Sequence, residues 1–158
     1  MAPPCSSFRP RQNELTSACI IATVRDSRLI KEPGSARPFG VLVADDCPYV
    51  LDVAAAFVEI LGGVCVRAIN AWAAVEAMEL HGADIDVAII DLLMPGADAY
   101  EARRLLHGHR PGLPCCLMSG TIFPGDDPPG GFDTILAKPF SLADMRNCLE
   151  KLGVMMAV

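Results

Sequence analysis

Five polar residues with the chemistry to bind a metal ion and a phosphoryl group each follow a short apolar run. They are two adjacent aspartates, a third aspartate, a serine and a lysine: Asp45, Asp46, Asp91, Ser119 and Lys138. Three carboxylates held together in a half-buried crevice repel one another unless a cation is shared among them. Mg²⁺ suits this role, because it prefers carboxylate and carbonyl oxygens and also binds phosphoryl oxygens. The lysine ammonium and the serine hydroxyl could then bind further oxygens of the same phosphoryl group.

Each of these residues also has an ordinary structural explanation. Asp45 or Asp46 could cap the helix that follows, and Asp91 could be a turn residue. Ser119 could be a loop hydroxyl, and Lys138 could be a solvated surface charge. Their joint occurrence at the ends of successive apolar runs favours one common site over five separate explanations.

The elements that must position these residues alternate between apolar runs and segments of helical period, which is typical of a parallel sheet with crossover helices. Strands are predicted at residues 41–44, 64–68, 86–90, 113–118 and 134–137. Helices are predicted at residues 48–61, 71–80, 97–106 and 142–152. This order predicts an α/β fold, a flavodoxin-like doubly wound sheet of five parallel strands, in which ligands bind beyond the carboxyl ends of the strands. All five polar residues should therefore converge at one edge of the sheet.

Local signals refine the prediction for two of these helices and for one connection. In the second, Trp72, Val75 and Met78 or Glu79 recur on one face. In the last, Ser141 is followed three positions later by an aspartate, an arrangement that predicts a capping box. Between Ser119 and the fifth strand, residues 120–133 contain three prolines and four glycines, so the helix expected there is short or absent.

The sequence divides into three parts. Residues 1–38 hold five of the thirteen prolines and are predicted to be a flexible N-terminal tail or linker, whose middle part could form a short helix or a strand. Residues 39–153 are predicted to form the folded domain, and residues 154–158 a C-terminal tail.

Composition argues against several classes of function. The net charge is −6, and residues 39–158 carry seven basic against sixteen acidic residues, which disfavours nucleic-acid binding. No run of eighteen apolar residues occurs, so we expect a soluble cytoplasmic protein without a membrane span. The seven cysteines lack the paired spacing of a zinc or redox site, and reduced, mostly buried thiols are the simpler interpretation.

Four motifs, VLVADD, IIDLLMPGADA, CLMSG and ILAKPF, resemble those of the response-regulator receiver domain of the CheY-like superfamily, over residues 39 to about 152. The resemblance implies that Asp91 is the phosphoacceptor. It also implies that Asp46 binds Mg²⁺ directly, that Asp45 supports the ion through water, and that the backbone carbonyl of Leu93 is a further ligand.

The resemblance extends to the remaining polar residues of the site. Ser119 would be the switch hydroxyl, and Lys138, which precedes an expected cis proline at Pro139, would contact the phosphoryl group. Ile135 stands where many receivers have a Tyr or Phe that reports phosphorylation, so this aromatic switch is missing or displaced. The lack of a regular helix at residues 120–133 is similar to an atypical subtype, and we hypothesise that this segment becomes ordered on phosphorylation or partner binding.

The implied function is that of a single-domain response regulator in a two-component system or phosphorelay, which signals by protein–protein binding. Its partner would be a sensor histidine kinase or a histidine phosphotransferase, and homodimer formation is left open. It would be no enzyme beyond catalysing its own aspartyl phosphorylation and dephosphorylation. Two alternatives are a receiver-like scaffold that needs no phosphorylation and a phosphatase of the haloacid-dehalogenase type, which would need an acid where Leu93 stands.

Overall fold

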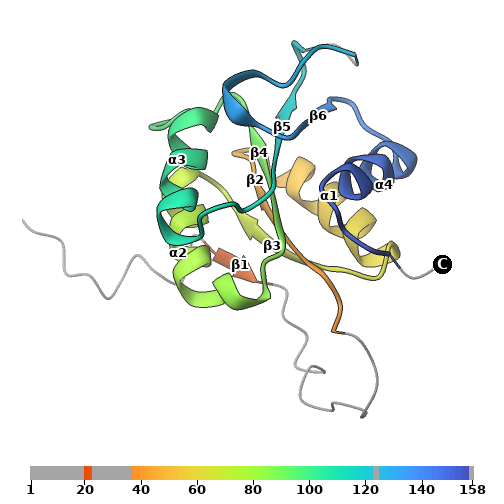
Figure 1. Ribbon diagram of the computed structural model, residues 1–158, viewed down its shortest axis with the longest axis horizontal. Coiled ribbons are helices and arrows are strands. Elements are labelled where there is room, and N and C mark those ends of the chain that lie inside the picture. Colours follow the sequence, from red (N-terminus) through yellow and green to blue (C-terminus); the bar gives the residue numbers. More distant parts are fainter. Residues whose placement is uncertain (1–19, 23–36, 123–124, 157–158) are drawn as a thin grey trace, which may run out of the picture.

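The computed structural model describes residues 20–22, 37–122 and 125–156. Most of the predicted N-terminal tail and the last residues of the predicted C-terminal tail lie outside these ranges, so the proposed domain boundaries stay predictions. Within the described parts, helices cover both faces of one central sheet (Figure 1).

The sheet contains the five parallel strands that the sequence predicts. They are β2 Gly40–Ala44, β3 Val64–Ala68, β4 Val87–Asp91, β5 Cys115–Ser119 and β6 Thr134–Ala137. The strand order is β1-β3-β2-β4-β5-β6, in which neighbours from β3 to β6 are parallel. The α/β doubly wound fold is therefore confirmed.

A sixth strand, which was not predicted, lies at one edge. β1 Ile20–Ala22 pairs antiparallel with β3, with Ile21 opposite Arg67. The sequence had left residues in this part of the chain open between helix and strand, and the structure assigns a strand to three of them.

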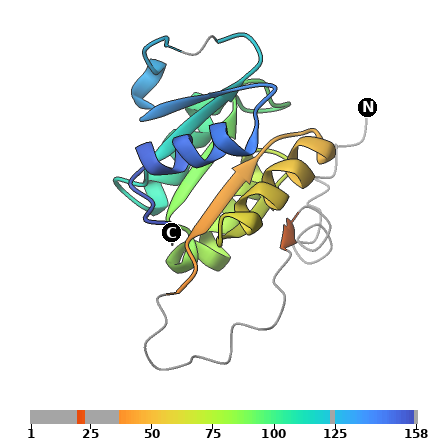
Figure 2. The ribbon, with the colours of Figure 1, turned by 90° about the vertical axis from the view of Figure 1, so that its right-hand side faces the viewer.

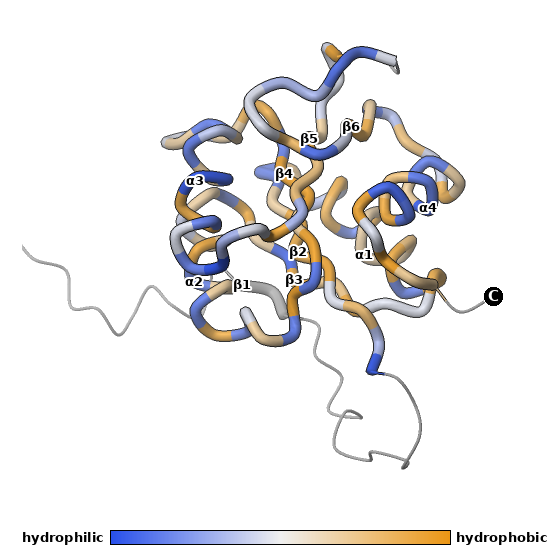
Figure 3. The backbone as a smooth tube through the Cα atoms, viewed as in Figure 1, coloured by the Kyte–Doolittle hydropathy of each residue, from blue (hydrophilic) through white to orange (hydrophobic). Residues whose placement is uncertain are grey.

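Four α-helices connect the strands: α1 Pro48–Ile60, α2 Ala71–His81, α3 Ala99–His109 and α4 Leu142–Lys151. α1 and α4 lie next to each other on one face of the sheet, as Figure 2 shows, and α2 and α3 cover the other. Neighbouring residues of a strand point to opposite faces, so β2 supplies Val41 and Val43 to the core beneath α1 and α4, and Leu42 and Ala44 to the core beneath α2 and α3. The apolar residues consequently concentrate along the strands (Figure 3).

The inward face of α2 differs from the prediction. Its buried residues are four alanines and one methionine: Ala71, Ala73, Ala74, Ala77 and Met78. Trp72 is 61% exposed, and Glu79 is also exposed. Because α2 packs against both the sheet and α3, its buried stripe is broad and takes small side chains, which leaves no room for an indole ring.

The predicted loss of a helix between β5 and β6 is confirmed for the part of this segment that the structure describes. Residues 120–122 and 125–133 contain one short 3₁₀ turn, Pro129–Gly131, and no α-helix. Phe132 covers the sheet instead. It is 5% exposed, its ring centroid lies 5.9 Å from that of Tyr100, and the guanidinium of Arg103 lies 5.7 Å from its ring.

Asp133 anchors the end of the same segment to β5. Its amide N–H donates to the Cys115 carbonyl at 2.9 Å, and its carboxylate accepts from the Cys115 amide at 2.8 Å. The second half of the predicted mobile segment is therefore packed and hydrogen-bonded, whereas its ordering on phosphorylation stays a prediction.

Two glycines offer opposite tests of the packing. A Cβ added at Gly40 would lie 1.7 Å from the backbone carbonyl oxygen of Asp84, whereas a Cβ at Gly108 in α3 would meet nothing within 4 Å. We expect Gly40→Ala to destabilise the fold by roughly 1–3 kcal/mol through overpacking. Gly108→Ala should stabilise it by about 0.5 kcal/mol through helix propensity. Urea unfolding followed by circular dichroism measures both changes in stability. A Gly40→Ala variant as stable as wild type would contradict the close approach of β2 to Asp84.

Candidate functional site

The three aspartates of the predicted site come together at the carboxyl ends of β2 and β4. Asp45 and Asp46 follow β2 directly, and Asp91 is the last residue of β4. β2 and β4 are neighbours with Ala44 opposite Ile90, so the residues after them lie side by side. One carboxylate oxygen from each aspartate lies within 4.8 Å of the other two. The sequence therefore predicted the acidic cluster correctly.

Lys138 joins this cluster from β6. Its Nζ donates to Asp45 Oδ2 at 2.5 Å and to Asp91 Oδ1 at 2.8 Å. The Lys138–Pro139 peptide bond is cis, as expected from the motif. The lysine thus contacts two acids that are 93 and 47 residues away in the sequence.

The charges of the site do not balance within the protein. Burial raises the pKa of Asp91, Lys138 lowers it, and the carboxylates of Asp45 and Asp46 raise it again, so the pKa lies above its ordinary value of 3.8. Burial alone would lower the pKa of Lys138, but its hydrogen bonds to Asp45 and Asp91 outweigh that effect and raise it above 10.5. Lys138 is therefore charged at neutral pH. One ammonium faces three carboxylates, and the excess negative charge makes the site fit for a divalent cation.

The two adjacent aspartates differ in how free their oxygens are. Asp45 is 1% exposed, and both its oxygens are bound: Oδ1 accepts from the Cys47 amide at 2.8 Å, and Oδ2 accepts from Lys138. Asp46 is exposed, and no residue in the described part of the chain makes a hydrogen bond or ion pair with it. This difference is what direct metal binding by Asp46 and indirect support by Asp45 would require.

Ser119 lies at the end of β5 and is 3% exposed. Its hydroxyl contacts Thr121, which the sequence analysis did not single out, and among the described residues it makes no hydrogen bond to Asp91 or Lys138. Its carbonyl accepts from the Lys138 amide at 2.8 Å, so the backbones of the two residues are linked. A short Ser-x-Thr spacing was the available signal for Thr121, but such spacings are common in loops.

Leu93 stands in the turn after β4, with its side chain 72% exposed. The role of its backbone carbonyl as a metal ligand stays a prediction. The position two residues after Asp91 therefore carries an exposed apolar side chain and no acid.

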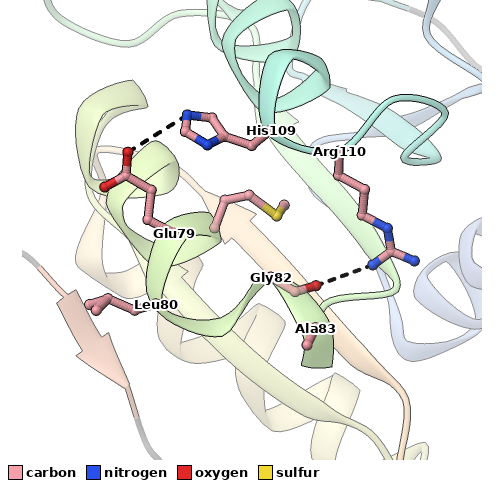
Figure 4. Close-up of a pocket in the computed structure, with 7 residues that line it drawn as sticks. Glu79, Leu80, Gly82, Ala83, His109 and Arg110 are labelled. Carbon is pink, nitrogen blue, oxygen red and sulfur yellow. Dashed lines mark hydrogen bonds and ion pairs between the residues drawn. The ribbon is translucent and has the colours of Figure 1, made fainter.

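A second hollow lies at the other end of the domain, between the C-terminal ends of α2 and α3. This groove has a volume of about 570 Å³, and His109 Nε2 lies 3.7 Å from Glu79 Oε1 across it. Figure 4 shows its lining residues, among which Arg110 donates to the Gly82 carbonyl. Arg110 also donates to the carbonyl of Ile85. These contacts tie α3 to the turn after α2, and the acidic cluster at the opposite end remains the candidate site.

Comparison with known sequences gives one relative of the expected kind. No protein-family model matches the chain. A response regulator receiver protein of Anaeromyxobacter sp. (strain Fw109-5) is 31% identical over 94 residues, which cover 60% of this chain and 38% of the relative. The chain thus spans well under half the length of that protein.

Solved structures extend the likeness to most of the described domain. The receiver domain of the hybrid histidine kinase CckA superposes with a TM-score of 0.62 at 24% identity, over 72% of this chain and 97% of that one. The receiver domain of a sensor histidine kinase from Pseudomonas aeruginosa PAO1, described with magnesium coordinated in its active-site cleft, gives a TM-score of 0.63 at 24% identity, over 75% and 100%. The chain has the receiver fold.

In this receiver fold the acidic cluster and Lys138 stand where the four sequence motifs predict them. The similarity to a response regulator receiver protein agrees with the resemblance that those motifs carry. No helix in the described ranges is both long enough and apolar enough to cross a membrane.

The crowded acids predict a pH-dependent effect of removing one of them. In metal-free buffer at pH 7, we expect Asp91→Asn to raise the free energy of unfolding by about 1 kcal/mol, as is typical when a functional group held at a cost to stability is replaced. Because the pKa of Asp91 is raised, the folded wild type loses stability as pH rises through the window above 3.8. The advantage of the variant should therefore vanish near pH 3.

Thermal unfolding with EDTA across this pH range measures the effect, and Asp127→Asn, which changes an exposed aspartate outside the cluster, is the matched control. If Asp91→Asn is less stable than wild type at pH 7, repulsion among the three carboxylates does not destabilise the fold, and the prediction is wrong.

Proposed function

We propose that this chain is a response-regulator receiver of a two-component system or phosphorelay, in which Asp91 accepts a phosphoryl group from a phosphohistidine. The observation that carries the proposal is the contact of one ammonium, Lys138 Nζ, with both Asp45 and Asp91 beside the free carboxylate of Asp46. In an ion pair with a purely structural role, one acid is enough to neutralise one base. Three acids around one lysine at the carboxyl end of a parallel sheet are better explained by a metal and phosphoryl site.

The chemical step assigns a role to each residue. A carboxylate oxygen of Asp91 attacks the phosphorus in line, the phosphorus–nitrogen bond of the phosphohistidine breaks, and its electron pair stays with the imidazole. Lys138, held at 2.8 Å from Asp91 Oδ1, offsets negative charge on the transferred group. Asp46, Asp91 and the Leu93 carbonyl would hold Mg²⁺, with Asp45 supporting it through water. When bound, the ion supplies positive charge next to the phosphoryl oxygens.

This chemistry makes the chain a catalyst of its own modification and dephosphorylation rather than an enzyme with a separate substrate. The new acyl phosphate adds charge at a site that is already rich in it, and this charge is the signal that partners would read. We expect signalling to pass through protein–protein binding in the cytoplasm.

The proposed donor is a sensor histidine kinase or a histidine phosphotransferase. The similar structures are themselves receiver domains of histidine kinases, which supports a donor of this class. The start of α1 offers a docking surface close to the acids, since Tyr49 is 74% exposed and stands three residues after Asp46. Action as a single domain is part of the proposal, and homodimer formation is left open.

The two alternatives differ from this proposal in what they require. A phosphatase of the haloacid-dehalogenase type needs a general acid two residues after its nucleophile, where this chain has Leu93. A scaffold that works without phosphorylation has no use for a lysine shared between two buried acids.

Phosphorylation by a small donor tests the proposal directly. With acetyl phosphate and Mg²⁺, we expect intact mass spectrometry to find one added phosphoryl group on the wild type and none on Asp91→Asn. Lys138→Met should slow the reaction about a hundredfold, since one charge-stabilising donor is lost. Lys151→Met, which removes an exposed lysine of α4, is the matched control and should react like wild type.

Phosphorylation of Asp91→Asn at the wild-type rate would refute the assignment. Steady turnover of a chromogenic phosphate ester would favour the phosphatase alternative. Folded protein that gains no phosphoryl group from acetyl phosphate or from a phosphorylated histidine domain would favour the scaffold.

A further inference from the structure

The hydroxyl of Ser119 is engaged with a residue outside the acidic cluster. The Thr121 amide donates to Ser119 Oγ at 3.0 Å, and the Oγ of Ser119 and the Oγ1 of Thr121 also lie 3.0 Å apart. Ser119 is 3% exposed, so solvent cannot easily replace these bonds. Thr121 is itself exposed and can therefore be changed without disturbing the core.

The backbone around Ser119 is fixed more firmly than its side chain. The Ser119 carbonyl accepts from the Lys138 amide at 2.8 Å, and the Met118 carbonyl accepts from the Leu92 amide at 2.8 Å. These bonds hold the end of β5 against the strands that carry Asp91 and Lys138. If Ser119 changes a hydrogen-bond partner, we therefore expect the change at its hydroxyl, through a rotation of the side chain, and not at its backbone.

Ser119 Oγ accepts from the Thr121 amide and has one proton of its own to donate, so any competition concerns the position of Oγ and not its proton. A side-chain rotation that carries Oγ towards an oxygen on Asp91 carries it away from Thr121. Both Thr121 contacts weaken in that rotation. Phosphorylation of Asp91 and the Ser119–Thr121 bonds therefore compete for the same side chain.

Thr121 also connects the hydroxyl to the segment that replaces the missing helix. The next residue, Ile122, is half-buried and packs against the core cluster that contains Phe132. Displacement of Thr121 would shift Ile122 and so disturb its packing against this core cluster. Ile135, which occupies the position of the usual aromatic switch, is half-buried and aliphatic and offers no hydroxyl or ring to report the change.

We propose that Thr121 is a positioning residue, which holds the Ser119 hydroxyl in the unphosphorylated chain and transmits its release to the β5–β6 segment in place of an aromatic switch. This inference rests on the proposed function, because it needs a phosphoryl group on Asp91. It adds a residue and a route that the receiver motifs do not contain.

Binding of beryllofluoride with Mg²⁺, a stable mimic of the phosphoryl group, tests the inference without a chemical step. Thr121→Val keeps the shape and the amide but removes the hydroxyl. We expect it to tighten beryllofluoride binding about fivefold, the change expected when one ordinary hydrogen bond no longer opposes the bound state. Thr121→Ser keeps the hydroxyl and should bind like wild type. In urea unfolding without beryllofluoride, Thr121→Val should be slightly less stable than the other two proteins, because it has lost the same hydrogen bond.

A double-mutant cycle with Ser119→Ala separates a role through Ser119 from any other role. In the Ser119→Ala background, Thr121→Val should change the affinity by less than twofold. Amide chemical shifts of Thr121 and Ile122 should move on beryllofluoride binding in the wild type and much less in the Ser119→Ala variant.

The outcomes distinguish this inference from the proposed function. If the wild type fails to bind beryllofluoride, both are refuted. If the wild type binds it and Asp91→Asn does not, but Thr121→Val matches wild type, only the role of Thr121 is refuted. A tighter Thr121→Val variant that stays tighter in the Ser119→Ala background also refutes it, because the effect would then bypass Ser119.

Discussion

The ammonium of Lys138 is the contact on which the rest of the site depends. It bridges Asp45 and Asp91 at 2.5 and 2.8 Å, and the three residues stand at the ends of three different strands, β2, β4 and β6. Without this cation, two carboxylates buried to 1% and 6% exposure would face each other with no compensating charge. The fold positions the three residues because parallel strands end together, so that residues distant in the sequence meet at one edge.

At this edge of the sheet, some side chains are held by hydrogen bonds and others can bind a ligand or change partner. Both carboxylate oxygens of Asp45 accept hydrogen bonds within the protein, whereas Asp46 is exposed and its oxygens are available to a ligand. Ser119 combines the two conditions: its carbonyl accepts from the Lys138 amide, and its hydroxyl is hydrogen-bonded to Thr121 in the loop that follows. Charge is thus gathered at the strand ends, and the polar group able to change partner stands where the connection from β5 to β6 begins.

Much of this arrangement could be predicted because it rests on local patterns. Continuous apolar runs predict buried strands, and polar residues at their ends then predict the cluster of Asp45, Asp91 and Lys138. The inward face of α2 could not be predicted fully in this way, because periodicity marks Trp72 as apolar but does not reveal that four of the five buried positions between two packed neighbours take alanine. β1 depends on pairing with a strand more than forty residues away, and three residues carry too little pattern to predict that. The Ser119–Thr121 contact depends on a rotamer, which no residue spacing specifies.

Between β5 and β6, the buried ring of Phe132 packs where a further helix would have covered the sheet beside α3. Burial of one aromatic side chain contributes roughly 1.5–3 kcal/mol, well below the 5–15 kcal/mol that typically separates folded from unfolded domains. This corner of the molecule can therefore open while the remaining core stays intact. Cover by one ring can open locally more easily than cover by a full helix, because fewer buried contacts have to be broken.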